Sequence, residues 1–188
     1  MNNTRRITAT ALATAALVAP SALASTAVAA PDKPTKPAKT VKAQTKQLLK
    51  DIAGKDKRLA RLSTSNAVEA LADDTEVEVV ANVTDAQTAL AELKTTVEAA
   101  DSTVDTRAVR KELRSFRVEN FRIVVTIVKM VEGLEEAAAA DPEAVTHLAA
   151  GEAAALEITA TSTKADLRAA REHVKAAQAE LEGETTTA

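Results

Sequence analysis

The chain contains no cysteine, tyrosine or tryptophan, and only two phenylalanines and two histidines among its 188 residues. Without cysteine it has no disulfide framework, no cysteine-ligated zinc site and no thiol nucleophile. Two aromatic side chains are too few for a base-stacking platform, and four glycines supply little for a phosphate-binding loop. The sequence therefore predicts no catalytic residue, no metal site and no cofactor.

Alanine is abundant instead, with 43 residues, which is half of the 46% of the chain that is hydrophobic. It is the best helix former, but each alanine buries little apolar area. This composition predicts a helical protein with a thin core and modest stability.

The first thirty residues have the pattern of a secretory signal peptide. Arg5 and Arg6 precede a charge-free stretch from Ile7 to Val18, and either Ala27-Val28-Ala29 or Val28-Ala29-Ala30 provides the small residues of a cleavage site. The apolar stretch is too short and too rich in alanine for a membrane anchor. Thr8 follows the arginine pair where a twin-arginine signal would carry a strongly apolar residue, which favours general secretion.

Composition divides the rest of the chain into an exposed Pro/Lys-rich linker at 31–40, a helical bundle at 41–182 and a disordered tail at 183–188. Charge is uneven along this part. Residues 31–61 carry ten basic and three acidic side chains, whereas residues 62–188 carry twelve basic and twenty-four acidic side chains. The predicted mature protein is a basic head on an acidic body, which argues against nucleic acid as a partner.

Two segments show heptad seams, in which apolar residues alternate at steps of three and four. The members of the first seam are Val79, Val83, Ala86, Leu90, Leu93 and Val97. The members of the second seam are Leu167, Ala170, Val174, Ala177 and Leu181. Each seam can be covered within the chain or by a second copy, so self-association is left open.

A long third helix is expected to begin near Asp105 or Thr106 and to run for about 33 residues, or roughly 50 Å. Residues 76–83 and 123–128 are also strand-prone by propensity, but their flanks keep helical periodicity. The residues expected to point inward are Val109, Leu113, Phe116, Ile123, Ile127, Val131 and Leu134.

Asp141-Pro142 predicts the start of a fourth helix, because proline suits the first helical position. The Thr/Ser stretch at 159–162 predicts a break, and the two helices around it, laid end to end, match the long third helix. The expected fold is all-α: an elongated antiparallel up-and-down bundle with coiled-coil-like seams and about four legs, the last one broken near 159–162.

The N-terminal basic residues are the main candidates for binding a polyanion, such as an anionic cell-wall polymer. They recur every three or four residues, first along the linker and then along the first helix. They are Lys33, Lys36, Lys39, Lys42, Lys46, Lys50, Lys55, Lys57, Arg58 and Arg61. The alternative is a solvated linker whose lysines keep it soluble or fold back onto the acidic bundle.

A weaker basic stripe follows one face of the third helix, at Arg107, Arg110, Arg114 and Arg117. It can bind anions, but the favoured interpretation is that these arginines pair with acids on neighbouring helices. The acids considered are Glu92, Glu98 and Glu172.

Other candidate chemistry is weak. Glu143 and His147 are spaced to face the same way on a helix, but His173 lies in another helix and further metal ligands are missing. Acidic pairs such as Glu135-Glu136 are assigned to helix ends and solubility. No serine lies in a Gly-x-Ser-x-Gly elbow.

The signal peptide, the Ala/Thr bias and the stretch from Leu113 to Phe121 resemble small secreted alanine-rich helical proteins of high-GC Gram-positive bacteria. The resemblance implies export and helices, and it assigns no catalytic residue. We therefore expect a secreted, non-enzymatic interaction or structural module of the cell envelope, held to a wall polymer or another envelope protein.

The alternative is a carrier that binds an apolar or amphiphilic ligand between its helices. The residues expected to line its cavity are Val124, Val125, Val128 and Met130.

Overall fold

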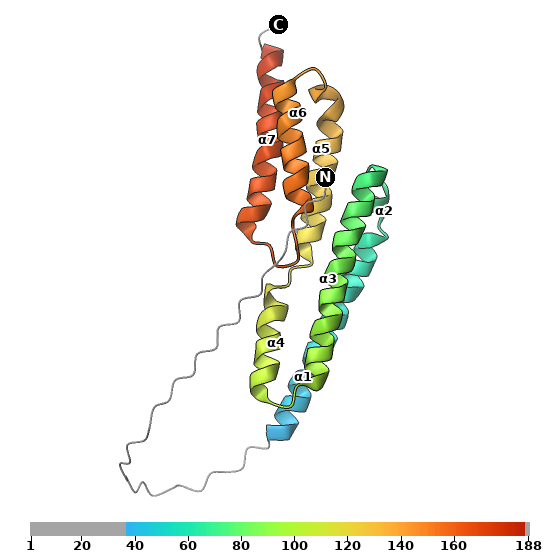
Figure 1. Cartoon of the computed structure of the whole chain (residues 1–188), viewed down its shortest axis with the longest axis vertical. Coiled ribbons are helices and arrows are strands. Elements are labelled where there is room, and N and C mark those ends of the chain that lie inside the picture. Colours follow the sequence, from blue (N-terminus) through green and yellow to red (C-terminus); the bar gives the residue numbers. More distant parts are fainter. Residues whose placement is uncertain (1–36, 187–188) are drawn as a thin grey trace, which may run out of the picture. The chain divides into compact units, whose positions relative to one another are not determined.

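The computed structural model describes residues 37–186, and this part of the chain is all-helical, with no strand (Figure 1). The prediction of helix over strand is therefore confirmed for 76–83 and 123–128. The helices are α1 (Pro37–Ser63), α2 (Asn66–Glu69), α3 (Asp73–Ala99), α4 (Thr103–Ser115), α5 (Glu119–Ala138), α6 (Pro142–Leu156) and α7 (Lys164–Thr186).

The ends of the described part overlap two predicted segments. Helix α1 includes residues 37–40 of the predicted linker, and α7 includes residues 183–186 of the predicted tail. The predicted signal peptide and residues 31–36 of the linker lie outside the described residues.

Helices α1, α3 and α4 pack mainly with one another, as do α5, α6 and α7, and the apolar cluster of the second group also includes Val68 of α2 and Val79 of α3 (Figure 1). Helices α1, α3 and α4 bury residues such as Leu48, Leu90 and Leu113. Helices α5, α6 and α7 bury residues such as Val128 and Leu148. The contacts thus form two three-helix groups where about four legs were expected.

Both predicted seams face the interior. All members of the first seam on α3 are buried except Leu93, which is half-buried. All members of the second seam on α7 are buried except Leu181, which is also half-buried. Because these side chains belong to the two apolar clusters, the seams are covered within the chain.

The prediction of one long third helix is wrong, because the chain leaves helical geometry between Ser115 and Glu119. Phe116 is extended (φ −75°, ψ 105°), and the Arg117 N–H donates to the Ala160 carbonyl at 2.6 Å. The break brings Phe116, Val118 and Phe121 into one apolar cluster. A straight helix would point these three side chains in different directions.

The expected end-to-end arrangement of the last two helices is also wrong. The helical chain does break, between Leu156 and Lys164, as the Thr/Ser stretch predicted. The break reverses the chain, however, so that α6 and α7 lie side by side (Figure 1). Alanine makes this close packing possible, since Ala155 and Ala170 are completely buried.

Helices α4 and α6 begin with well-formed caps. The Ser102 hydroxyl accepts from the Asp105 N–H at 3.2 Å, and the Asp105 carboxylate accepts from the Ser102 N–H at 3.2 Å. The hydrogen bond from Ser102 holds the pKa of Asp105 below its ordinary value. At α6 the Asp141 carboxylate accepts from the Glu143 N–H at 2.9 Å, with Pro142 at the first position as predicted.

Among the described helices, none combines the length and the apolar character required to cross a bilayer.

Two glycines inside helices provide a test of this packing. A Cβ at Gly133 of α5 would meet nothing within 4 Å, whereas at Gly151 of α6 it would lie 3.1 Å from Val174 Cγ2 and 3.3 Å from His173 Cβ. We expect Gly133→Ala to raise the free energy of unfolding by about 0.5–1 kcal/mol through helix propensity. Gly151→Ala should be less stable than Gly133→Ala by at least about 1 kcal/mol, since crowding opposes the same gain. Urea denaturation measures both, and equal gains would contradict the α6–α7 packing.

Candidate functional site

A basic groove lies between α1 and α4, with a volume of about 570 Å³. Five of its lining side chains are cationic, and one is acidic. The residues lining this groove are Leu48, Lys50, Asp51, Gly54, Lys55, Arg58, Arg110, Leu113 and Arg114. The groove thus brings together part of each of the two basic stripes that the sequence showed separately.

Helical periodicity explains this arrangement. Leu48 and Leu113 are buried and hold α1 and α4 together at the floor of the groove. Lys50 lies two positions after Leu48, and Arg110 and Arg114 lie three before and one after Leu113, so these cations line the groove beside the buried anchors. Gly54 leaves space in the wall, since no other group comes within 4 Å of where its Cβ would be.

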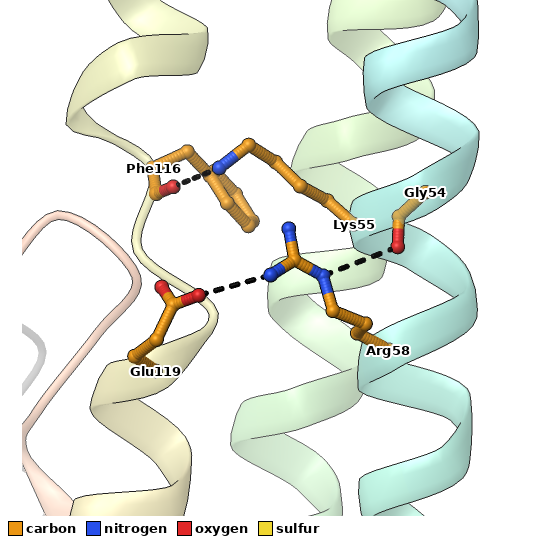
Figure 2. Close-up of polar contacts among 5 residues, drawn as sticks. All are labelled: Gly54, Lys55, Arg58, Phe116 and Glu119. Carbon is orange, nitrogen blue, oxygen red and sulfur yellow. Dashed lines mark hydrogen bonds and ion pairs between the residues drawn. The ribbon is translucent and has the colours of Figure 1, made fainter.

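Lys55, which lines the groove, crosses from α1 to the break between α4 and α5 (Figure 2). Its Nζ donates to the Phe116 carbonyl at 2.6 Å and lies 5.9 Å from the centroid of the Phe116 ring. Burial lowers the pKa of Lys55 below 10.5, and the nearby Glu119 carboxylate partly offsets this effect. Lys55 is therefore a structural cation that satisfies a carbonyl left without a helical partner.

Arg58 makes a second bridge to the same break (Figure 2). Its guanidinium donates to the Glu119 carboxylate at 3.0 Å and to the Gly54 carbonyl at 3.4 Å. The side chains of Arg58 and Glu119 are 53% and 64% exposed, so this ion pair contributes about 0–1 kcal/mol. Asp51, the acid in the groove, accepts a hydrogen bond from Gln47 at 2.8 Å.

The predicted polyanion-binding residues separate into three sets. Lys50, Lys55 and Arg58 line the groove. Other exposed residues of α1 lie outside it, namely Lys42, Lys46, Lys57 and Arg61. Lys33, Lys36 and the side chain of Lys39 lie outside the described residues.

The second stripe also separates, since Arg110 and Arg114 line the groove while Arg107 and Arg117 are exposed elsewhere. The favoured pairing of this stripe with acids on neighbouring helices is not found among the described residues. The ion pairs there are Arg58–Glu119, Lys94–Glu98 and Lys175–Glu172. Glu98 and Glu172 thus pair with lysines of their own helices.

An apolar crevice of about 520 Å³ lies on another face of α4, where α3, the α4–α5 break and the α6–α7 turn meet. Its apolar lining residues are Ala86, Ala89, Leu93, Phe116, Phe121, Ile158 and Ala160. Its polar lining residues are Asn82, Asp85, Glu92, Thr96, Glu112, Ser115, Thr159 and Thr161. No signal in the sequence located this crevice, because it depends on the break at Phe116 and on the return of the chain after α6.

Hydrogen bonds from two asparagines fix the α6–α7 turn against the rest of the crevice. Asn120, which is buried, donates to the Thr159 carbonyl at 2.9 Å and to the Ser162 carbonyl at 3.1 Å. Asn82, which is half-buried, donates to the Leu156 carbonyl at 2.7 Å. No signal in the sequence marked this anchor, because Asn120 is the second residue of α5 and follows the charged Glu119.

The residues expected to line a carrier cavity do not line this crevice. Val124, Val125 and Val128 are buried in the cluster of α5, α6 and α7, and Met130 is 40% exposed. Val125 and Met130 instead border a smaller pocket of about 340 Å³ beside Leu62 and Ala67, so the structure brings two of the four expected lining residues together.

The two histidines are neighbours in space. The rings of His147 on α6 and His173 on α7 have centroids 6.3 Å apart. Within residues 37–186, no group of three or more metal-ligating side chains comes together.

The titration of Lys55 gives a testable pH dependence. The unfolded chain binds more protons than the folded chain between the lowered pKa of Lys55 and 10.5, so this residue makes the free energy of unfolding rise with pH across that window. Lys55→Met removes the contribution, and the wild type should gain stability relative to this variant as pH approaches 10.5. Denaturation at a series of pH values measures the difference. Lys57→Met, at an exposed position of the same helix, is the control, and an identical trend there would contradict the assignment.

Asn120 should be important for stability. Asn120→Ala leaves the Thr159 and Ser162 carbonyls without their donor, and we expect it to lower the free energy of unfolding by about 1–3 kcal/mol. Asn82→Ala removes one hydrogen bond made by a half-buried residue, and it should lower the free energy of unfolding by less than Asn120→Ala does. Chemical denaturation compares the two, and a larger loss at Asn82 would show that the turn is held differently.

No family model, curated protein or solved structure matches this chain. The resemblance to small secreted proteins of high-GC Gram-positive bacteria therefore stays a prediction, and function must be inferred from the groove and the crevice themselves.

Proposed function

We propose that this protein is a secreted, non-enzymatic interaction module of the bacterial cell envelope that binds an anionic wall polymer in the groove between α1 and α4. The observation that carries the proposal is the convergence of five cations around one groove, of which Arg58 pairs with Glu119 and Lys55 bonds the Phe116 carbonyl, while Asp51 is the one acid in the lining. Cations gathered along a cleft produce a local positive potential even when the whole chain is acidic.

The chemistry of the groove favours binding over catalysis. Arginine and lysine are donors that recognise phosphate and carboxylate groups, and arginine does so with a planar fork. Asp51, the carboxylate of the groove, accepts from Gln47 and is exposed, so it is a poor candidate for a tuned general base.

The shape of the basic surface favours a polymer over a small anion. Beyond the groove, α1 carries Lys42 and Lys46 towards one end and Lys57 and Arg61 towards the other, all exposed. A repeating polyanion can contact several of these charges together, so that weak individual contacts add up.

Secretion is part of the proposal and rests on the sequence. Arg5 and Arg6, the apolar stretch 7–18 and the small residues before Pro31 support export through a cleaved signal peptide. An exported protein with a basic groove meets wall polymers as its most abundant polyanions.

The proposal is tested with Arg110→Glu/Arg114→Glu in the mature chain. This change reverses two groove charges at exposed or half-buried positions, so the fold should persist. We expect binding to purified Gram-positive cell walls to weaken by at least about tenfold at low salt, measured by co-sedimentation over a salt series.

Arg168→Glu/Arg171→Glu is the matched control, since it makes the same charge change at two exposed positions of α7. It should retain most of the binding. Equal loss in both variants would mean that net charge alone governs attachment, and unchanged binding by the groove variant would reject the groove as the site.

A further inference from the structure

We infer that the apolar crevice is a second, independent binding site, and that its ligand is a small amphiphilic cation: a hydrocarbon tail with an amine or quaternary ammonium head. The inference does not rest on the proposed function of the groove. The volume of the crevice, about 520 Å³, lies within the range of about 300–1,000 Å³ that is typical of small-molecule pockets.

The crevice exposes apolar surface that the fold would otherwise have covered. On the α3 seam, Leu93 stays half-buried while Leu90 and Val97 on either side are fully packed. Leu93 and Ala89 line the crevice together with Glu112 and Ser115 near the end of α4, and a hydrocarbon tail can cover this apolar surface.

The charge of the lining determines the sign of the head group. Asp85, Glu92 and Glu112 line the crevice, and its lining includes no lysine, arginine or histidine. All three acids are exposed, and none forms an ion pair with a residue of the described part. Three carboxylates beside apolar surface attract a cation and repel an anionic amphiphile such as a fatty acid.

The walls of the crevice are built in advance. The hydrogen bonds of Asn120, Asn82 and the Arg117 N–H hold the α6–α7 turn in place without a ligand. A preformed pocket requires little ordering when its ligand enters, which favours affinity.

The experiment uses decyltrimethylammonium below its micelle-forming concentration, with decanoate as an anionic probe of similar tail length. Binding to the mature protein is followed by isothermal titration calorimetry and by changes in the NMR spectrum. We expect one site for the cation, and affinity for decanoate lower by at least about tenfold. Equal affinity for both probes would overturn the inference.

Two variants locate the site. Ala89→Trp fills the crevice and should weaken binding of the cation by at least about tenfold, whereas Ala91→Trp, at an exposed position of α3 outside the crevice, should not. Glu92→Gln/Glu112→Gln should reduce the preference for the cation over decanoate, and Glu135→Gln/Glu136→Gln is its control. Circular dichroism confirms folding of each variant, and unchanged binding by folded Ala89→Trp would reject the crevice as the site.

Discussion

The structure depends on the point where the chain leaves helical geometry between Ser115 and Glu119. A helix end leaves backbone groups without partners, and here they are satisfied from outside: Lys55 donates to the Phe116 carbonyl, and the Arg117 N–H donates to the Ala160 carbonyl. These bonds connect the break to α1 on one side and to the α6–α7 turn on the other. The break is thus one of the places where the two three-helix groups are connected, besides the hydrogen bonds from Asn82 to Leu156 and from Thr75 to Glu152.

The same break explains why α4 has two chemically different faces. Arg110 and Arg114 face α1 and line the basic groove, whereas Glu112 and Ser115 line the acidic, apolar crevice. Phe116 contributes to both regions, since its ring faces the Lys55 ammonium and also lines the crevice. Because both ends of this short helix are held in place, its rotation about its own axis is fixed. It can therefore present opposite charges on opposite faces.

Local periodicity was sufficient to predict which faces of the helices are buried, but not how the helices meet. The α3 and α7 seams could be identified from the sequence because their residues repeat at steps of three and four. The break at Phe116 could not, because Leu113, Phe116 and Ile123 keep the three- and seven-residue spacing of one helical face across it. The groove and the crevice were missed for the same reason, since each combines residues from separate helices.

The alanine-rich composition links the packing to the two proposed sites. Ala138, Ala144, Ala155 and Ala170 are buried without residual exposure, so α5, α6 and α7 can pack closely with little room for a ligand among them. At the α4–α5 break the larger side chains of Phe116 and Phe121 line the crevice instead. Both proposed sites therefore lie at the surface beside this break, where the cations of the groove and the carboxylates of the crevice give the two sites opposite charge.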